Sequence, residues 1–144
     1  MPVAAPVPTA FGEDTLTSAI ADRSQPVVLF ALEWCEFCWA LRKFFRRIGV
    51  PFRSVDLDSA AWQEENRGGQ VRTALHARLG RPTIPQVFVG SEWVGGCTDT
   101  FDAWRSGQLQ ALLTKAGARF DADAVQDPNS FLPAWIQATP RAAG

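Results

Sequence analysis

Long hydrophobic runs and a surplus of charge of one sign are both absent from this sequence. No apolar stretch approaches the roughly 18 residues that a membrane-spanning helix needs. The net charge is -1 at pH 7, so no basic surplus exists to attract nucleic acid or an anionic membrane surface. Residues 1–13 lack the basic segment that begins a secretory signal peptide. We therefore expect a cytoplasmic monomer with neither nucleic acid nor a membrane as partner.

Cysteine and histidine are scarce, with three cysteines and one histidine in the chain. An odd number of cysteines, two of them close together, argues against the disulfide framework of a small secreted protein. A zinc site at the close pair would need two more ligands, and the only candidates, His76 and Cys97, are isolated in the sequence. We therefore predict no metal site and interpret the pair as redox-active.

The length and composition predict one globular domain with tails. Hydrophobic residues make up 47% and charged residues 20% of the 144 residues, which is enough to form one core. Residues 1–13 contain three prolines and are expected to be a flexible tail. Residues 14–117 are expected to form the domain. Residues 118–144 form a C-terminal extension, which we expect to be docked or partly ordered because of its small apolar cluster, Phe131, Leu132, Trp135 and Ile136.

Hydrophobic periodicity predicts an α/β fold with a mixed four-stranded sheet flanked by helices. The expected helices are residues 14–23, capped by Asp14, residues 36–48, residues 58–79 with a break at Gly68-Gly69, and a last helix capped by Thr98 or Asp99. The expected strands are residues 27–32, 52–56, 86–89 and 92–94. The first two form a parallel β-α-β unit and the last two a hairpin around Gly90-Ser91.

One face of the helix at residues 36–48 is strongly basic. It carries Arg42, Lys43, Arg46 and Arg47. This face is either a solvated surface that suits a helix C-terminus or a docking patch for a partner.

The chemistry is concentrated in Cys35-Glu36-Phe37-Cys38, which begins the same helix directly after the buried strand. Free N–H groups and the helix dipole stabilise a thiolate at Cys35, which makes it the candidate nucleophile. Cys38 lies one turn further and is close enough to resolve a mixed disulfide on Cys35. The negative charges of Glu33 and Glu36 oppose thiolate formation, so the helix terminus must outweigh them.

Three motifs together resemble the glutaredoxin family of the thioredoxin superfamily, over roughly residues 14–117. They are the cysteine pair after a strand, the segment Thr83-Ile84-Pro85-Gln86-Val87-Phe88, and the segment Gly95-Gly96-Cys97-Thr98-Asp99. The resemblance implies a thioredoxin-like fold in which the bond before Pro85 is cis and the proline faces the active cysteine.

The resemblance also implies a glutathione site. The backbone at Thr83, Ile84 and Pro85 would pair with the cysteinyl part of glutathione. Gly96, Thr98 and Asp99 would hold its γ-glutamyl end, because glycine allows close approach and a helix N-terminus stabilises a carboxylate. Arg72 would grip the glycine carboxylate, although a solvated helix residue is the alternative. Phe37 stands where the family usually has tyrosine.

Four further residues depart from the family pattern. Leu32 replaces a lysine that would contact glutathione, and Glu36 replaces the usual proline between the cysteines. Trp34 resembles thioredoxins, and Trp93 resembles glutaredoxin-like proteins that take electrons from thioredoxin reductase. With Trp39, these tryptophans are either packing residues or a hydrophobic rim for protein substrates.

The predicted function is that of a glutathione-dependent thiol-disulfide oxidoreductase that reduces protein disulfides and glutathione mixed disulfides, with glutathione as co-substrate and no obligatory metal. Its partners would be glutathione and disulfide-bearing or glutathionylated proteins. Three alternatives stay open: a [2Fe-2S] carrier with Cys35 and glutathione as cluster ligands, a redoxin coupled to thioredoxin reductase, and a catalytically weak binding module.

Overall fold

The computed structural model describes residues 7–137, so the two ends of the chain, including Pro2, Pro6 and residues 138–144, lie outside the described residues. The sheet has the order β2-β1-β3-β4, with bounds β1 Val27–Ala31, β2 Arg53–Asp56, β3 Gln86–Val89 and β4 Glu92–Gly95. β1 pairs with β2 in parallel and with β3 antiparallel, and β3 pairs antiparallel with β4. The predicted mixed four-stranded sheet is confirmed.

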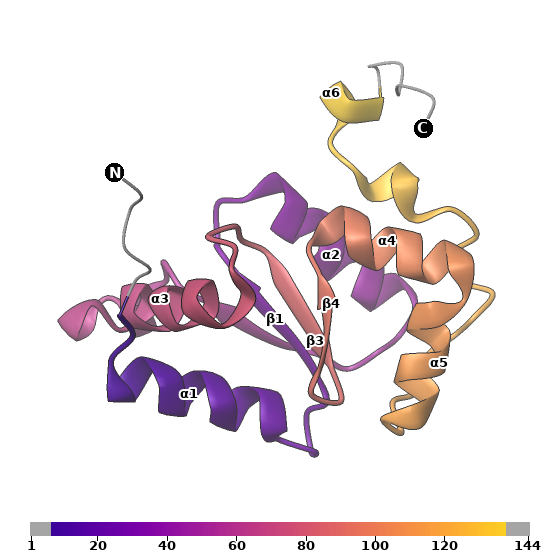
Figure 1. Cartoon of the computed structure of the whole chain (residues 1–144). Helices are drawn as coiled ribbons and strands as arrows, with labels where there is room; N and C mark the ends of the chain where they lie inside the picture. Colours follow the sequence, from indigo (N-terminus) through magenta and orange to yellow (C-terminus); the bar gives the residue numbers. More distant parts are fainter. Residues whose placement is uncertain (1–6, 138–144) are drawn as a thin grey trace.

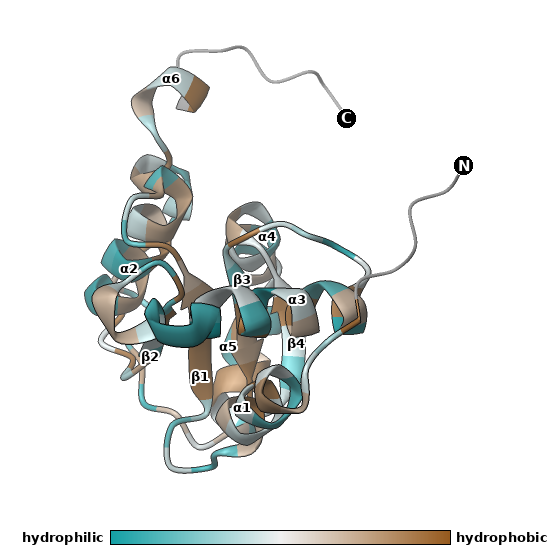
Figure 2. Ribbon diagram, turned by 90° about the vertical axis from the view of Figure 1, so that its left-hand side faces the viewer, coloured by the Kyte–Doolittle hydropathy of each residue, from teal (hydrophilic) through white to brown (hydrophobic). Residues whose placement is uncertain are grey.

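Helices cover both faces of the sheet (Figure 1). α1 Ala10–Ala21 and α3 Arg67–Leu79 pack on one face. α2 Glu36–Arg47, α4 Cys97–Ser106 and α5 Gln108–Lys115 pack on the other. Every residue of β1 is buried, and Figure 2 shows this strand as hydrophobic along its length. No helix within residues 7–137 combines the length and the apolarity that a membrane crossing requires.

α1 begins earlier than its sequence pattern indicates. Thr9 is the N-cap, because its hydroxyl accepts a hydrogen bond from the Gly12 N–H at 3.0 Å and donates to Gln70 Oε1 at 2.6 Å. The prediction of a helix capped by Asp14 was therefore wrong, and the helix ends at Ala21 rather than at residue 23. The contact with Gln70 on α3 is long-range, so local sequence does not reveal it.

The break before α3 also differs from the prediction. Two short 3-10 turns, Ala60–Trp62 and Glu64–Asn66, precede α3, and the positive φ angles fall at Glu65 and Asn66. Gly68 and Gly69 lie inside α3 instead of interrupting it. A Cβ at Gly68 would overlap the carbonyl of Leu57. This glycine is therefore explained by close packing and not by a helix break.

The C-terminal segment follows α5 and contains a 3-10 turn, Pro128–Phe131, and the short helix α6 Ala134–Gln137. Val125 and Leu132 are buried in the same core as α2 and α4. In Figure 1 the segment runs past α4 to α6 at the top of the molecule. It lies on the face of the sheet that carries the cysteine pair.

Candidate active site

Cys35 occupies the N-cap of α2, between the end of β1 and the first helical turn. Its backbone is extended, with φ -141° and ψ 117°, and its sulfur accepts a hydrogen bond from the Cys38 N–H at 3.4 Å. The side chain of Cys35 is half-buried, whereas Cys38 is buried completely. The structure therefore brings the pair together and leaves Cys35 as the sulfur that an incoming molecule can reach.

Cys38 lies behind Cys35 in an apolar environment. Burial raises the pKa of the Cys38 thiol to about 12, and the hydrogen bond with Cys35 acts in the same direction. The Leu32 N–H, which donates to Cys38 Sγ at 3.4 Å, opposes the rise, as does the positive charge of Arg42. Cys38 is therefore a protonated thiol at neutral pH.

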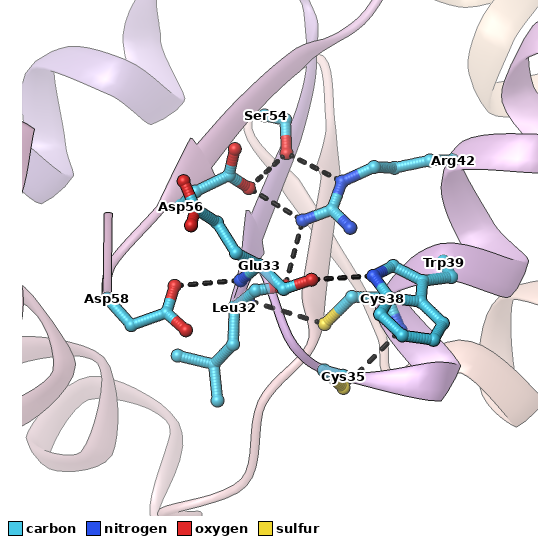
Figure 3. A network of polar contacts seen from close by, with 9 residues as sticks. All are labelled: Leu32, Glu33, Cys35, Cys38, Trp39, Arg42, Ser54, Asp56 and Asp58. Atoms are coloured by element: carbon cyan, nitrogen blue, oxygen red, sulfur yellow. Dashed lines mark hydrogen bonds and ion pairs between the residues drawn. The ribbon is translucent and has the colours of Figure 1, made fainter. Parts of the chain in front are cut away.

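Arg42 lies beneath the cysteine pair and is not part of a solvated basic face. Only 11% of its side chain is exposed, and its Nη2 atom pairs with Asp56 Oδ1 at 2.7 Å. The same Nη2 atom donates to the Leu32 carbonyl at 2.9 Å, while Ser54 Oγ accepts from Arg42 Nε at 3.3 Å (Figure 3). The interpretation of Arg42 as a surface cation was wrong, because its partners come from β2 and the loop after β1.

The loop from Thr83 to Pro85 enters β3 beside the site. The peptide bond between Ile84 and Pro85 is cis, as the resemblance implied. Buried Gln86 holds this loop, since Nε2 donates to the Thr83 carbonyl at 3.0 Å while Oε1 accepts from Trp93 Nε1 at 2.8 Å. Gln86 is a positioning residue that was not predicted from the sequence. A glutamine at the first position of a fully buried strand was the available signal.

The two glycines before α4, Gly95 and Gly96, lie against Asp99 and the Pro85 carbonyl. Asp99 Oδ2 accepts a hydrogen bond from the Gly96 N–H at 3.0 Å. Gly95 has φ +122°, and a Cβ there would lie 2.5 Å from Asp99 Oδ2. Gly96 adjoins the Pro85 carbonyl, 3.5 Å from the place a Cβ would take. Because Gly96 is the N-cap, the prediction that Thr98 or Asp99 caps this helix was wrong.

The cation at this end of the site is Arg81. Its Nη1 atom lies 3.6 Å from Asp99 Oδ2, and its guanidinium carbon is 5.3 Å from the ring centroid of Trp93. Arg72 is exposed on α3, and its role at a glycine carboxylate stays a prediction. Thr98 is also exposed, beside Asp99. Arg81 was not predicted from the sequence, because it is an isolated cation in a loop with no periodic pattern.

Cys97 and His76 lie on opposite faces of the sheet, Cys97 in the α2 and α4 core and His76 on α3. Burial raises the pKa of Cys97 to about 12, and the electrostatic effect of Cys35 adds to it. Within residues 7–137, no group of three or more His, Cys, Asp or Glu side chains is arranged to hold a metal ion.

Glu36 and Phe37, between the two cysteines, contact the C-terminal segment. Glu36 Oε2 accepts a hydrogen bond from Trp135 Nε1 at 2.7 Å. The ring of half-buried Phe37 meets the Trp135 ring edge-on, with centroids 6.3 Å apart. Leu32, on the other side of the pair, packs against the core beneath α1 and α3.

Comparisons with known proteins all indicate one family. The family model described as Glutaredoxin matches residues 27–94. Glutaredoxin-C6 of Oryza sativa subsp. japonica is 37% identical over 95 residues, which is 66% of this chain and 80% of that protein. A glutaredoxin of Solanum lycopersicum is 38% identical over 93 residues, covering 65% of this chain and 82% of that protein.

Solved structures give the same result. A wheat glutaredoxin superposes with a TM-score of 0.68 at 32% identity, covering 79% of this chain and 99% of that one. A buckwheat glutaredoxin–glutathione complex superposes with a TM-score of 0.65 at 30% identity, covering 78% of this chain and 99% of that one. About a fifth of this chain therefore has no counterpart in either structure.

Proposed function

We propose, because this chain belongs to the glutaredoxin family, that it is a glutathione-dependent thiol-disulfide oxidoreductase with Cys35 as nucleophile. The observation that carries the proposal is the placement of Cys35. Its half-buried sulfur forms the N-cap of α2, where it accepts the Cys38 N–H. A sulfur in this position is open to the incoming disulfide with which thiol-disulfide exchange begins.

The glutathione part of the proposal is supported by the segments beside Cys35. The backbone at Thr83, Ile84 and Pro85 would bind the cysteinyl part of glutathione. Gly96, Thr98 and Asp99 would bind its γ-glutamyl end. The related buckwheat glutaredoxin was solved as a complex with glutathione. In this chain Arg81 adds a cation next to Asp99. Arg72 and Phe37 complete the proposed site.

The monothiol reaction uses Cys35 alone. Its thiolate attacks the glutathione sulfur of a protein–glutathione mixed disulfide and forms a disulfide between Cys35 and glutathione. The old S–S bond breaks, and the protein sulfur leaves as a thiolate that takes a proton from solvent. A second glutathione thiolate then attacks the bound glutathione sulfur, which releases oxidised glutathione and regenerates the Cys35 thiolate.

The dithiol reaction also requires Cys38. Cys35 attacks one sulfur of a protein disulfide and forms a mixed disulfide with it, while the other protein sulfur is released. Cys38 loses its proton and attacks Cys35 Sγ, which frees the remaining protein sulfur and closes a Cys35–Cys38 disulfide. Two molecules of glutathione reduce this disulfide and leave as oxidised glutathione.

Cysteine variants test the proposal. With cysteine–glutathione mixed disulfide as substrate, and glutathione reductase with NADPH to report oxidised glutathione, Cys35→Ser is expected to abolish turnover. Cys38→Ser is expected to keep this activity but to lose the dithiol reduction of a protein disulfide. Cys97→Ser is the matched control, because it removes a buried thiol that takes no part in either reaction. A Cys35→Ser variant with the wild-type rate would contradict the mechanism.

The alternative of a [2Fe-2S] carrier, with Cys35 and glutathione as cluster ligands, stays a prediction. Coupling to thioredoxin reductase also stays a prediction, which is based on the resemblance at Trp93.

A further inference from the structure

The C-terminal segment is fixed along α2 and α4. Trp104 Nε1, on α4, donates to the Val125 carbonyl at 2.9 Å. Arg105 Nη1 donates to Asn129 Oδ1 at 2.7 Å. Further along, Phe131 meets the buried ring of Phe44 with centroids 6.2 Å apart. These contacts hold the chain before α6 in a defined place, so the residues that follow reach a defined part of the surface.

That part of the surface is the cysteine motif itself. Trp135 contacts both residues between the cysteines, through the hydrogen bond to Glu36 and the edge contact with Phe37. The hydrogen bond gives a physical reason for glutamate at position 36, because the side chain of the proline that the resemblance implied there could not accept the indole N–H. The extension therefore contributes a side chain to the border of the proposed active site.

This border is unusually rich in exposed tryptophan. The exposed fractions are 81% for Trp34, 40% for Trp39 and 60% for Trp135. Trp34 and Trp39 contact each other edge-on with centroids 6.0 Å apart. Large apolar side chains gathered in water mark interaction sites, and tryptophan is enriched where proteins bind proteins.

Between α2 and the extension lies a groove of about 570 Å³. The α2 wall contains Glu36, Trp39 and Lys43, and the extension wall contains Phe131, Pro133 and Trp135. The groove is continuous with the cysteine motif, because Glu36 belongs to both. Four of these six side chains are apolar. The exceptions are Lys43 and Glu36, and Glu36 is hydrogen-bonded to Trp135.

We propose that this groove binds the polypeptide that flanks the reactive cysteine of a protein substrate, with apolar side chains against Trp39 and Trp135. The proposal rests on the function proposed above. In the dithiol reaction the substrate sulfur is bonded to Cys35, and in deglutathionylation it is the leaving group, one S–S bond beyond the glutathione sulfur that Cys35 attacks. In both reactions the substrate's own chain therefore comes close to Glu36 and Phe37, which directly follow Cys35. A residue two positions from that sulfur reaches about 7 Å further, which is enough to enter an adjoining groove. Glutathione itself is only a tripeptide, and the site proposed for it lies at residues 83–85 and the start of α4.

Two synthetic peptides, each glutathionylated on a single cysteine, test the proposal. One carries leucine on both sides of the cysteine and the other carries serine, and cysteine–glutathione mixed disulfide is the small reference substrate. We expect wild type to favour the leucine peptide. Trp135→Ala should lower kcat/KM for that peptide by about tenfold, mainly through KM, since tryptophan at a binding centre contributes this much. It should change the other two substrates by less than twofold.

Two further variants make the test decisive. Trp39→Ala, on the opposite wall and outside the extension, should produce the same selective loss, so the result does not depend on the extension staying folded. Phe11→Ala removes an equally exposed aromatic ring, 40% exposed, on α1 at the other face of the sheet, and should change nothing.

Two outcomes would overturn the inference. One is faster turnover of the leucine peptide by Trp135→Ala, which would make the extension a steric barrier. The other is equal loss on all three substrates. A wild-type protein inactive on cysteine–glutathione would instead refute the proposed function, so the two failures are distinguishable.

Discussion

At the scale of single residues, the two cysteines of the motif differ most in their access to water. Cys35 is half-buried, and Cys38 is buried with a pKa that burial raises to about 12. In the mixed disulfide Cys35 carries no thiolate, so its own effect on Cys38 disappears, whereas the burial remains. The attack of Cys38 is therefore expected to limit the dithiol reaction near neutral pH.

This limit predicts a specific pH dependence. Below its pKa, the thiolate fraction of Cys38 rises about tenfold per pH unit. Reduction of a protein disulfide should accelerate by roughly that factor per unit between pH 6.5 and pH 8.5, when measured in single-turnover experiments. Deglutathionylation by Cys38→Ser should show no contribution from this titration and is the control. A dithiol rate that does not change over this range would refute the assignment of Cys38 as resolving thiolate.

Arg42 gives a second prediction at this scale. Its positive charge lowers the pKa of Cys38, and its guanidinium holds the Leu32 carbonyl. Arg42→Met removes both effects and leaves Asp56 without its cation. We expect the dithiol rate at pH 7 to fall several-fold and the free energy of unfolding to fall by about 1–3 kcal/mol, while deglutathionylation changes little. Arg47→Met, which removes an exposed cation in the last turn of the same helix, should alter none of these quantities.

At the scale of elements, α3 shows how packing replaces local propensity. Glycine inside a helix costs about 1 kcal/mol relative to alanine, so two adjacent glycines predict a break. The structure instead places Gly68 against the backbone of Leu57, where no side chain fits. The atoms nearest to a Cβ at Gly69 belong to the side chain of Asn66, which can move.

The two glycines therefore respond differently to the same substitution. Gly68→Ala should lower the free energy of unfolding by about 1–3 kcal/mol, because a backbone carbonyl cannot move away without shifting the chain. Gly69→Ala should stay within about 1 kcal/mol of wild type, because gained helix propensity offsets the displacement of Asn66. Urea denaturation measures both values. Equal effects of the two substitutions would contradict this packing argument.

At the scale of the whole molecule, two buried thiols share the core between the sheet and α2. Burial raises the pKa of both Cys38 and Cys97 from an ordinary value of 9.0 to about 12. Above pH 9 the unfolded chain releases these two protons while the folded chain keeps them, so rising pH favours unfolding. Their stabilising contribution is complete below pH 9 and is lost progressively up to pH 12.

Alkaline stability tests this linkage. Between pH 8 and pH 10 each thiol should lose about 1.4 kcal/mol, so the pair should lower the free energy of unfolding by about 3 kcal/mol. The double variant Cys38→Ala, Cys97→Ala should lose correspondingly less over the same range, when denaturant curves are compared under reducing conditions. The two proteins differ in no other titratable group, so the comparison isolates the two thiols. Parallel pH profiles for the two proteins would rule out the shared burial effect.

The sequence by itself determined the elements whose signals are local. The buried run at β1, the apolar periodicity of α2 and the turn residues Gly90-Ser91 each specify a conformation within a few neighbouring residues. The same is true of Cys35 at the start of a helix. These features follow from periodicity and turn chemistry, which do not depend on distant parts of the chain.

Only the tertiary structure decided which distant residues meet. Thr9 caps α1 with support from Gln70, and Arg42 turns inward because Asp56 on β2 pairs with it. Trp135 reaches Glu36 across 99 positions of sequence. Each of these contacts brings together segments that chain order leaves far apart. Packing of the whole core, rather than local propensity, fixes their positions.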